Sequence, residues 1–153
     1  MTNAMSSPFA VAWQQRLVEG FPLLAAMGVT VQGTAEHWQL HAPFAPNRND
    51  HGTAFGASIS SLATIAGWMA VNVWADMPVD VVIQHGSTDF VRPLQSDLRA
   101  QVALVSPEAI LKLNGTLARG RPARLAVEVT VTAVDDPAMT AAQFAGRYVA
   151  VRL

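Results

Sequence analysis

The pattern of apolar and polar positions predicts a helix and then a β-hairpin at the start of the chain. Large apolar residues recur every four positions through residues 9–17, behind the helix-start signal Ser7-Pro8. Apolar and polar side chains then alternate through residues 29–32 and 37–42, which predicts two strands joined by a turn. The intervening segment, which starts at Phe21-Pro22, is expected to be a connector.

One long uncharged segment occupies the middle of the chain. Residues 52–75 contain no Asp, Glu, Lys or Arg, and a helix is expected from about residue 53 to 73. Large apolar residues form one stripe of this helix, and small residues such as Gly67 form another that allows a sheet to approach closely. The segment is long enough for a bilayer span, but its Ser and Thr content and its Asp flanks favour a buried core helix.

The second half of the chain is mostly β-strand. Ser106-Pro107 predicts a helix start between two of the strands, and Gly86 is a candidate β-bulge. One long apolar helix against a single antiparallel sheet is an α+β arrangement, in which the sheet must curl to cover the helix. The expected strands are residues 79–92, 98–105, 125–132 and 144–151.

Composition limits the possible functions. The 153 residues suit a single domain spanning residues 1–153, and the 14% of charged residues lies well below the usual level of about 25%, so we expect an oligomer interface to hide surface. The net charge of −1 argues against a nucleic-acid partner. The absence of cysteine excludes disulfides and thiolate chemistry, and no metal site or cofactor is expected. The N-terminus lacks signal-peptide features, which predicts a cytoplasmic protein.

Four short motifs stand out along the chain. They are Pro46-Asn47-x-Asn49-x-x-Gly52-Thr53-Ala54-Phe55-Gly56-x-Ser58, Ala66-Gly67-Trp68, Ser87-Thr88-Asp89-Phe90-Val91-Arg92-Pro93 and Gln143-Phe144-x-Gly146-Arg147-Tyr148. With these motifs the chain resembles the hotdog-fold acyl-CoA thioesterases over nearly its whole length. The likeness is closest to the thioesterase domain that follows an acetyltransferase domain in some bacterial proteins. It implies a central helix wrapped by a curved antiparallel sheet, and a homodimer or dimer of dimers with active sites near the N-terminus of that helix.

The resemblance also implies where a catalytic carboxylate is expected. Many hotdog thioesterases carry one two to three turns into the central helix, and that position aligns with Thr64, which cannot act as a general base at neutral pH. In another subgroup the catalytic Asp lies in the loop before the helix, and Asp50-His51-Gly52 is similar to that arrangement. Asp50 is therefore the candidate base, with capping of the helix or a structural role in the loop as its alternative.

Thioester hydrolysis needs an activated water, a stabilised oxyanion and a dry cleft for the acyl chain. The free N–H groups of a helix N-terminus around Phe55 and Gly56 suit the oxyanion, although Gly56 has tight packing as its alternative role. Asn47 and Asn49 are candidates for orienting the water or binding the carbonyl, or for shaping the loop. Thr64 either holds the water or bonds back to its own helix.

Five residues are candidate substrate contacts. Arg92 suits the phosphates of coenzyme A, with a solvated turn as the alternative. Ser61 is not expected to be a nucleophile, because no G-x-S-x-G elbow is present. His51 could titrate near neutral pH, although a loop histidine beside an aspartate is more often exposed. The five candidates are His51, Thr53, Phe55, Ser61 and Arg92.

The expected function is hydrolysis of an acyl-CoA or acyl carrier protein thioester by activated water. A non-catalytic module that binds acyl-CoA or lipid is the alternative, and Thr64 would then mark the loss of the base. Dehydration of a hydroxyacyl thioester is a third possibility, but it needs a His–acid pair that the sequence does not place convincingly.

Overall fold

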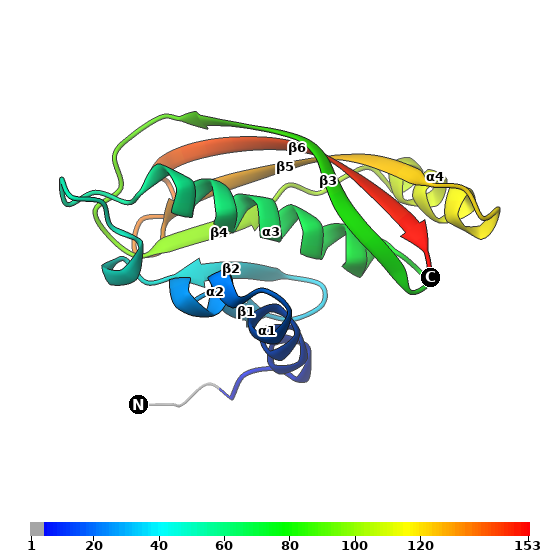
Figure 1. Ribbon diagram of the computed structural model, residues 1–153, viewed down its shortest axis with the longest axis horizontal. Helices are drawn as coiled ribbons and strands as arrows, with labels where there is room; N and C mark the ends of the chain where they lie inside the picture. The colour runs from blue at the N-terminus through cyan, green and yellow to red at the C-terminus, as the bar shows by residue number, and fades with distance from the viewer. Residues whose placement is uncertain (1–4) are drawn as a thin grey trace.

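A computed structural model of the chain describes residues 5–153 as a curved antiparallel sheet wrapped around one long helix (Figure 1). The helices are α1 Pro8–Gly20, α2 Pro22–Met27, α3 Gly56–Trp74 and α4 Pro107–Ala118, with a 3₁₀ turn η1 at Ala45–Asn47. The strands are β1 Thr30–Gly33, β2 Trp38–Ala42, β3 Val79–Phe90, β4 Leu98–Val102, β5 Ala123–Ala133 and β6 Thr140–Arg152. The strand order is β1-β2-β4-β5-β6-β3, and every neighbouring pair is antiparallel. This is the α+β hotdog architecture that the sequence predicts.

Helix α3 packs closely against the sheet because small residues face it. Gly67 lies against Tyr148 of β6, so closely that a Cβ atom on Gly67 would lie 2.3 Å from the tyrosine hydroxyl oxygen. The Tyr148 hydroxyl donates a hydrogen bond of 2.7 Å to the Thr64 carbonyl. The expected role of the small-residue stripe is confirmed at this contact.

The length and hydropathy of α3 would also suit a membrane span, and it is the only such helix within residues 5–153. Half of its most apolar stretch is buried inside the domain. Packing as the core helix accounts for this apolar character, as expected for the central helix of a wrapped sheet.

The two edges of the sheet differ in how they are covered. At the β1 edge, the Gln14 side chain of α1 donates to the Val29 carbonyl at 2.8 Å and accepts from the Val31 N–H at 2.7 Å. Strand β3 pairs only with β6, and its other edge has no partner in the described part of the chain. Val82 and Phe90 are exposed along β3. A long, apolar, unpaired edge is a template for pairing with another chain.

The segment predicted as a connector after Phe21 is instead the short helix α2. Pro22 opens this helix, because its fixed φ suits the first helical position. Gly28 ends it in the left-handed conformation, with a φ of 71°. The prediction of a connector was therefore wrong. The sequence did not reveal the helix because six residues are too few to show a helical period.

Several expected positions also differ from the structure. Strand β4 ends at Val102 rather than at residue 105, and β6 begins at Thr140 rather than at residue 144. Helix α3 begins at Gly56, three residues later than expected, because Phe55 is extended and the preceding residues form a hydrogen-bonded loop. The irregularity in β3 falls between Ile83 and His85, so the bulge expected at Gly86 was misplaced.

Candidate functional site

The first turn of α3 presents backbone N–H groups that no group within residues 5–153 occupies. The N–H groups of Gly56, Ala57 and Ser58 have no hydrogen-bond partner within residues 5–153. The first N–H to join the helical pattern is that of Ile59, which donates to the Phe55 carbonyl at 3.1 Å. No side chain caps this helix, so its partial positive end is free to meet an anion or an oxyanion.

Asn47 lies beside this turn and is only 1% exposed. Its Nδ2 group donates to the carbonyls of Met27 at 2.8 Å and Pro43 at 2.7 Å, and its own carbonyl accepts from the Phe55 N–H at 2.7 Å. Its Oδ1 atom, also buried, has no partner among the described residues. Leaving a buried acceptor unpaired is costly, so a water molecule or a ligand group is expected there.

Asn47 and the first turn of α3 share a hollow of about 240 Å³, here called the amide hollow. Phe55, Ala57, Ser58 and Ser61 complete its polar and backbone side, and residues of α2 close the other side. The amide hollow is therefore lined both by Asn47, which carries a buried unpaired acceptor, and by Ala57 and Ser58, whose N–H groups are free.

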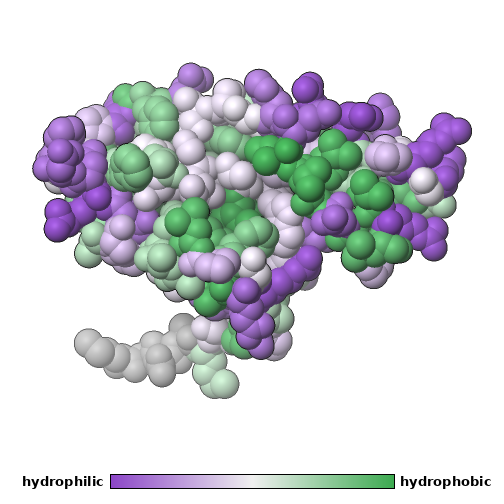
Figure 2. All heavy atoms as spheres, in the orientation of Figure 1, coloured by the Kyte–Doolittle hydropathy of each residue, from purple (hydrophilic) through white to green (hydrophobic). Residues whose placement is uncertain are grey.

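The amide hollow adjoins a larger cleft of about 630 Å³, here called the apolar groove. The two share Leu23, Ala57 and Ser61 on their walls. The groove follows α3 as far as Trp68, with α2 on one side and the first half of β3 on the other. Its volume lies in the range of about 300–1,000 Å³ that is usual for small-molecule sites. Figure 2 shows hydrophobic residues gathered in the middle of this face and hydrophilic ones at its two ends.

Three hydroxyl side chains stand on the α3 wall of the apolar groove. Ser60 donates to the Thr88 hydroxyl at 3.0 Å, whereas Ser61 and Thr64 are half-buried and have no side-chain hydrogen bond within residues 5–153. The hydroxyl of Tyr148, on β6, donates a hydrogen bond to the Thr64 carbonyl. Burial raises the pKa of Tyr148, so its hydroxyl stays protonated and remains a donor.

The loop before α3 holds Asn49, Asp50 and His51 in different roles. Asn49 Oδ1 accepts from the N–H groups of His51 at 2.9 Å and Thr53 at 3.1 Å, and its Nδ2 donates to the Thr53 hydroxyl at 2.8 Å. Asn49 therefore shapes the loop. Asp50 and His51 stand at its tip, 3.3 Å apart, with side chains 87% and 78% exposed.

Asp50 and His51 line neither the amide hollow nor the apolar groove. The alternative role of Asp50 as a helix cap is wrong, because Phe55 occupies the N-cap position. No carboxylate or imidazole lines either cavity. Within residues 5–153, no group of three or more His, Asp or Glu side chains is placed to hold a metal ion.

A hollow of about 330 Å³ on the other flank of the first turn holds Thr53, Gly56 and Arg92. Phe90 forms part of its wall, and its ring would lie 3.4 Å from a Cβ atom on Gly56. The Arg92 side chain is exposed here, and its backbone N–H is held by the Ala141 carbonyl at 3.1 Å. An arginine is therefore present at the same end of α3 as the free N–H groups.

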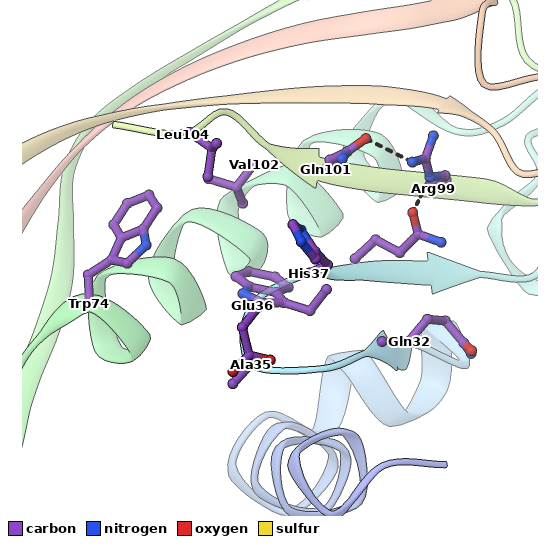
Figure 3. Close-up of a pocket in the computed structure, with 12 residues that line it drawn as sticks. Gln32, Ala35, Glu36, His37, Trp74, Arg99, Gln101, Val102 and Leu104 are labelled. Carbon is purple, nitrogen blue, oxygen red and sulfur yellow. Dashed lines mark hydrogen bonds between the residues drawn. The ribbon is translucent and has the colours of Figure 1, made fainter. Parts of the chain in front are cut away.

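A fourth hollow, of about 410 Å³, lies at the opposite end of α3, beside Trp74 (Figure 3). The Arg99 guanidinium donates to the side-chain oxygens of Gln39 and Gln101 there (Figure 3). Burial and the nearby Arg99 lower the pKa of His41, which lies on the same strand as Gln39. Because Trp74 is the last residue of α3, these polar groups are remote from the amide hollow.

The structure thus gathers most, but not all, of the residues expected from the sequence. Those on the amide hollow and apolar groove are Asn47, Phe55, Ser61 and Thr64, and those on the neighbouring flank are Thr53, Gly56 and Arg92. The walls contributed by Phe21, Leu23 and Leu24 were not expected, because the sequence predicts a connector where α2 forms. The Pro22 and Gly28 pair is the signal that could have revealed this helix.

Comparisons with known proteins place this geometry in a family. Residues 11–152 match the family model described as "Putative thioesterase (yiiD_Cterm)". A protein of unknown function from Chlorobaculum tepidum has a similar structure, with a TM-score of 0.85, 21% identity and 94% of each chain covered. A protein from Shewanella oneidensis, described as a putative thioesterase, has a TM-score of 0.81 and 25% identity over 94% of this chain and 97% of its own.

A third similar structure, from Bacillus halodurans, was solved with CoA. Its TM-score is 0.63 at 18% identity, covering 93% of this chain and 83% of its own. The fold is shared throughout, and the family match spans almost the whole chain. The chain therefore belongs to this family of hotdog-fold thioesterases.

Proposed function

We propose that this protein hydrolyses the thioester of an acyl-CoA or acyl carrier protein substrate with an activated water molecule. One observation carries the proposal: free N–H groups, a buried unpaired acceptor and an apolar groove meet in adjoining cavities at the N-terminus of α3. These are the parts that thioester hydrolysis needs, namely oxyanion donors, a water site and a dry channel for the acyl chain. The family match supports the reaction class.

In the proposed reaction the thioester carbonyl oxygen points at the N–H groups of Gly56 and Ala57. Water adds to the carbonyl carbon, and the negative charge that develops on the oxygen is stabilised by these preorganised donors and by the helix dipole. The tetrahedral intermediate then collapses, releasing the thiolate and the carboxylic acid. The donors are already free, so no hydrogen bond of the helix must break for this step.

The attacking water is proposed to donate one hydrogen bond to Asn47 Oδ1, which would give that buried acceptor a partner. The hydroxyl groups of Ser61 and Thr64 offer further partners from the helix wall. None of these groups is a base at neutral pH. Asp50 is the proposed base. It lines neither cavity, so the proposal requires its loop tip to move toward the water when substrate and a partner subunit cover the loop.

Arg92 is the proposed contact for a coenzyme A phosphate. It is exposed beside Thr53 and Gly56, on the flank of α3 next to the reacting carbonyl. A guanidinium suits phosphate because it donates two parallel hydrogen bonds. The assignment applies to the coenzyme A form of the substrate.

A homodimer formed through the free edge of β3 completes the proposed site. Val81, Val82 and Ile83 of β3 form one wall of the apolar groove, so pairing of two β3 edges would bring the partner subunit to this wall. Pairing would also satisfy the free edge and cover exposed apolar side chains. A dimer of such dimers is compatible with the same contact.

The absence of a base from the cavity walls favours one alternative, a module that binds acyl-CoA without cleaving it. A direct test measures thiol release and equilibrium binding for acyl-CoAs of increasing chain length with the wild-type protein. Catalytic release of free thiol is the expected result. Tight binding without release would establish the binding module. A protein that neither binds nor cleaves acyl-CoA would contradict both functions.

A further inference from the structure

Trp68 lines the end of the apolar groove that lies farthest along α3 from the amide hollow, and its side chain is fixed by four contacts. Its indole N–H donates to the Val81 carbonyl of β3 at 2.8 Å. The ring packs edge-on against Phe21, with centroids 5.0 Å apart, and against Trp13, with centroids 6.2 Å apart. The Arg16 guanidinium lies 5.0 Å from its ring centroid. These contacts come from three segments of the chain, namely α1, Phe21 and β3, so the indole forms a rigid wall.

The lining of the groove changes in polarity along α3. Ser60, Ser61 and Thr64 supply hydroxyl groups toward the amide hollow, whereas Ile65 and Trp68 make the far end apolar. A pantetheine arm carries amide groups that would find no side-chain partner at that end. The end at Trp68 therefore suits the terminal methyl group of an acyl chain whose carbonyl lies at the amide hollow.

We propose that Trp68 is the specificity-determining residue that limits the length of the acyl chain. Ala57 and Trp68 are eleven residues apart, which is about 16 Å along an α-helix. Van der Waals contact with the ring takes up about 4 Å of this length, leaving about 12 Å for the chain. An extended carbon chain advances about 1.25 Å per carbon, from a bond of about 1.52 Å and an angle near 111°.

This length corresponds to an acyl group of about ten carbons. The inference rests on the proposed thioesterase function and names its substrate class as medium-chain acyl thioesters. Each further buried methylene should improve binding about fourfold until the chain meets Trp68, and longer chains should lose this gain.

The test compares wild type with Trp68→Leu on saturated acyl-CoAs of six to sixteen carbons. Wild type should gain in kcat/KM up to about ten carbons and fall beyond that length. Trp68→Leu should move the optimum to longer chains, raising the fourteen-carbon to eight-carbon ratio of kcat/KM by at least about tenfold. Equilibrium binding of each acyl-CoA is measured beside turnover.

Two variants serve as controls. Trp68→Phe keeps an aromatic wall without the indole donor and should keep the wild-type limit. Trp74→Leu makes the same Trp-to-Leu change on the same helix but lines the hollow of Figure 3, so its length profile should not change. A shifted profile in Trp74→Leu would mean that the change at Trp68 is not specific.

The chain-length proposal can fail separately from the proposed function. If wild type hydrolyses sixteen-carbon substrates as well as ten-carbon ones, the proposal is overturned without any variant. A folded Trp68→Leu protein with the wild-type length profile overturns it as well. If wild type binds acyl-CoA without turnover, the proposed function fails. The chain length at which acyl-CoA affinity stops increasing then still tests the role of Trp68.

Discussion

At the scale of single residues, Gly67 determines how closely α3 approaches the sheet. A Cβ atom there would lie 2.3–2.8 Å from the hydroxyl and ring atoms of Tyr148, which is fully buried. Gly67→Ala should therefore reduce the free energy of unfolding by about 1–3 kcal/mol, measured by urea denaturation. Gly115→Ala is the matched control, because only the flexible end of Arg119 lies near its Cβ position, at 3.6 Å. Equal losses in the two variants would contradict the close helix–sheet contact.

Asn47 and Asn49 show what the sequence could and could not predict about single residues. Both were candidate site residues, and both are asparagines in the same loop. The structure separates them by their hydrogen bonds: Asn49 uses its side chain within the loop, whereas Asn47 leaves Oδ1 buried and unpaired. No periodicity or motif encodes that difference, because it depends on which carbonyls surround each amide in the fold.

At the scale of elements, periodic segments were predicted well and short ones were not. Helix α1, with Ser7 accepting from the Ala10 N–H at 3.0 Å, and the β1–β2 hairpin match the expected positions. Strand β5 alternates between buried and exposed residues as predicted. Helix α2 and the start of α3 were missed, because they depend on backbone conformation at Gly28 and Phe55 rather than on a repeated pattern.

The loop that leads into α3 carries the proposed base. Asp50→Asn removes the base and keeps the size of the side chain, so kcat should fall by about 10²–10⁴ with little change in stability. Stability should hold because Asp50 does not cap α3 and its side chain is 87% exposed. His51→Gln is the control at the same loop tip. Near-normal thiol release by Asp50→Asn would show that the base is supplied from elsewhere.

At the scale of the whole molecule, the open edge of β3 predicts a dimer. Gln14 of α1 occupies part of the opposite edge, whereas the outer edge of β3 has no partner within residues 5–153. Val82→Lys places a charge on the exposed part of β3 and should convert the dimer to monomer in light scattering. Loss of the dimer should also lower turnover, because β3 forms a wall of the apolar groove.

Leu111→Lys is the control for this prediction. Leu111 is an exposed apolar residue on α4, a helix that packs against β5 and β6, so the same substitution should leave the dimer intact. A wild-type protein that stays monomeric at micromolar concentration would contradict the dimer and weaken the assignment of Asp50, whose role assumes a covered loop.

The most direct measurement of the central claim removes one free N–H group from the N-terminus of α3. Gly56→Pro deletes the Gly56 donor without breaking a helical hydrogen bond, since proline is favoured at the first helical position. Phe55 already has the extended backbone that a following proline requires, with φ −66° and ψ 130°. Gly56→Ala is the matched control, because it adds a Cβ atom at an ordinary 3.4 Å from Phe90 and keeps the donor.

If this N–H group stabilises the oxyanion, kcat for thiol release from a medium-chain acyl-CoA should fall by about 10²–10³ in Gly56→Pro. Gly56→Ala should stay within a few-fold of wild type, and both variants should unfold at similar urea concentrations. Equal turnover by folded Gly56→Pro and Gly56→Ala proteins would contradict an active site at the N-terminus of α3.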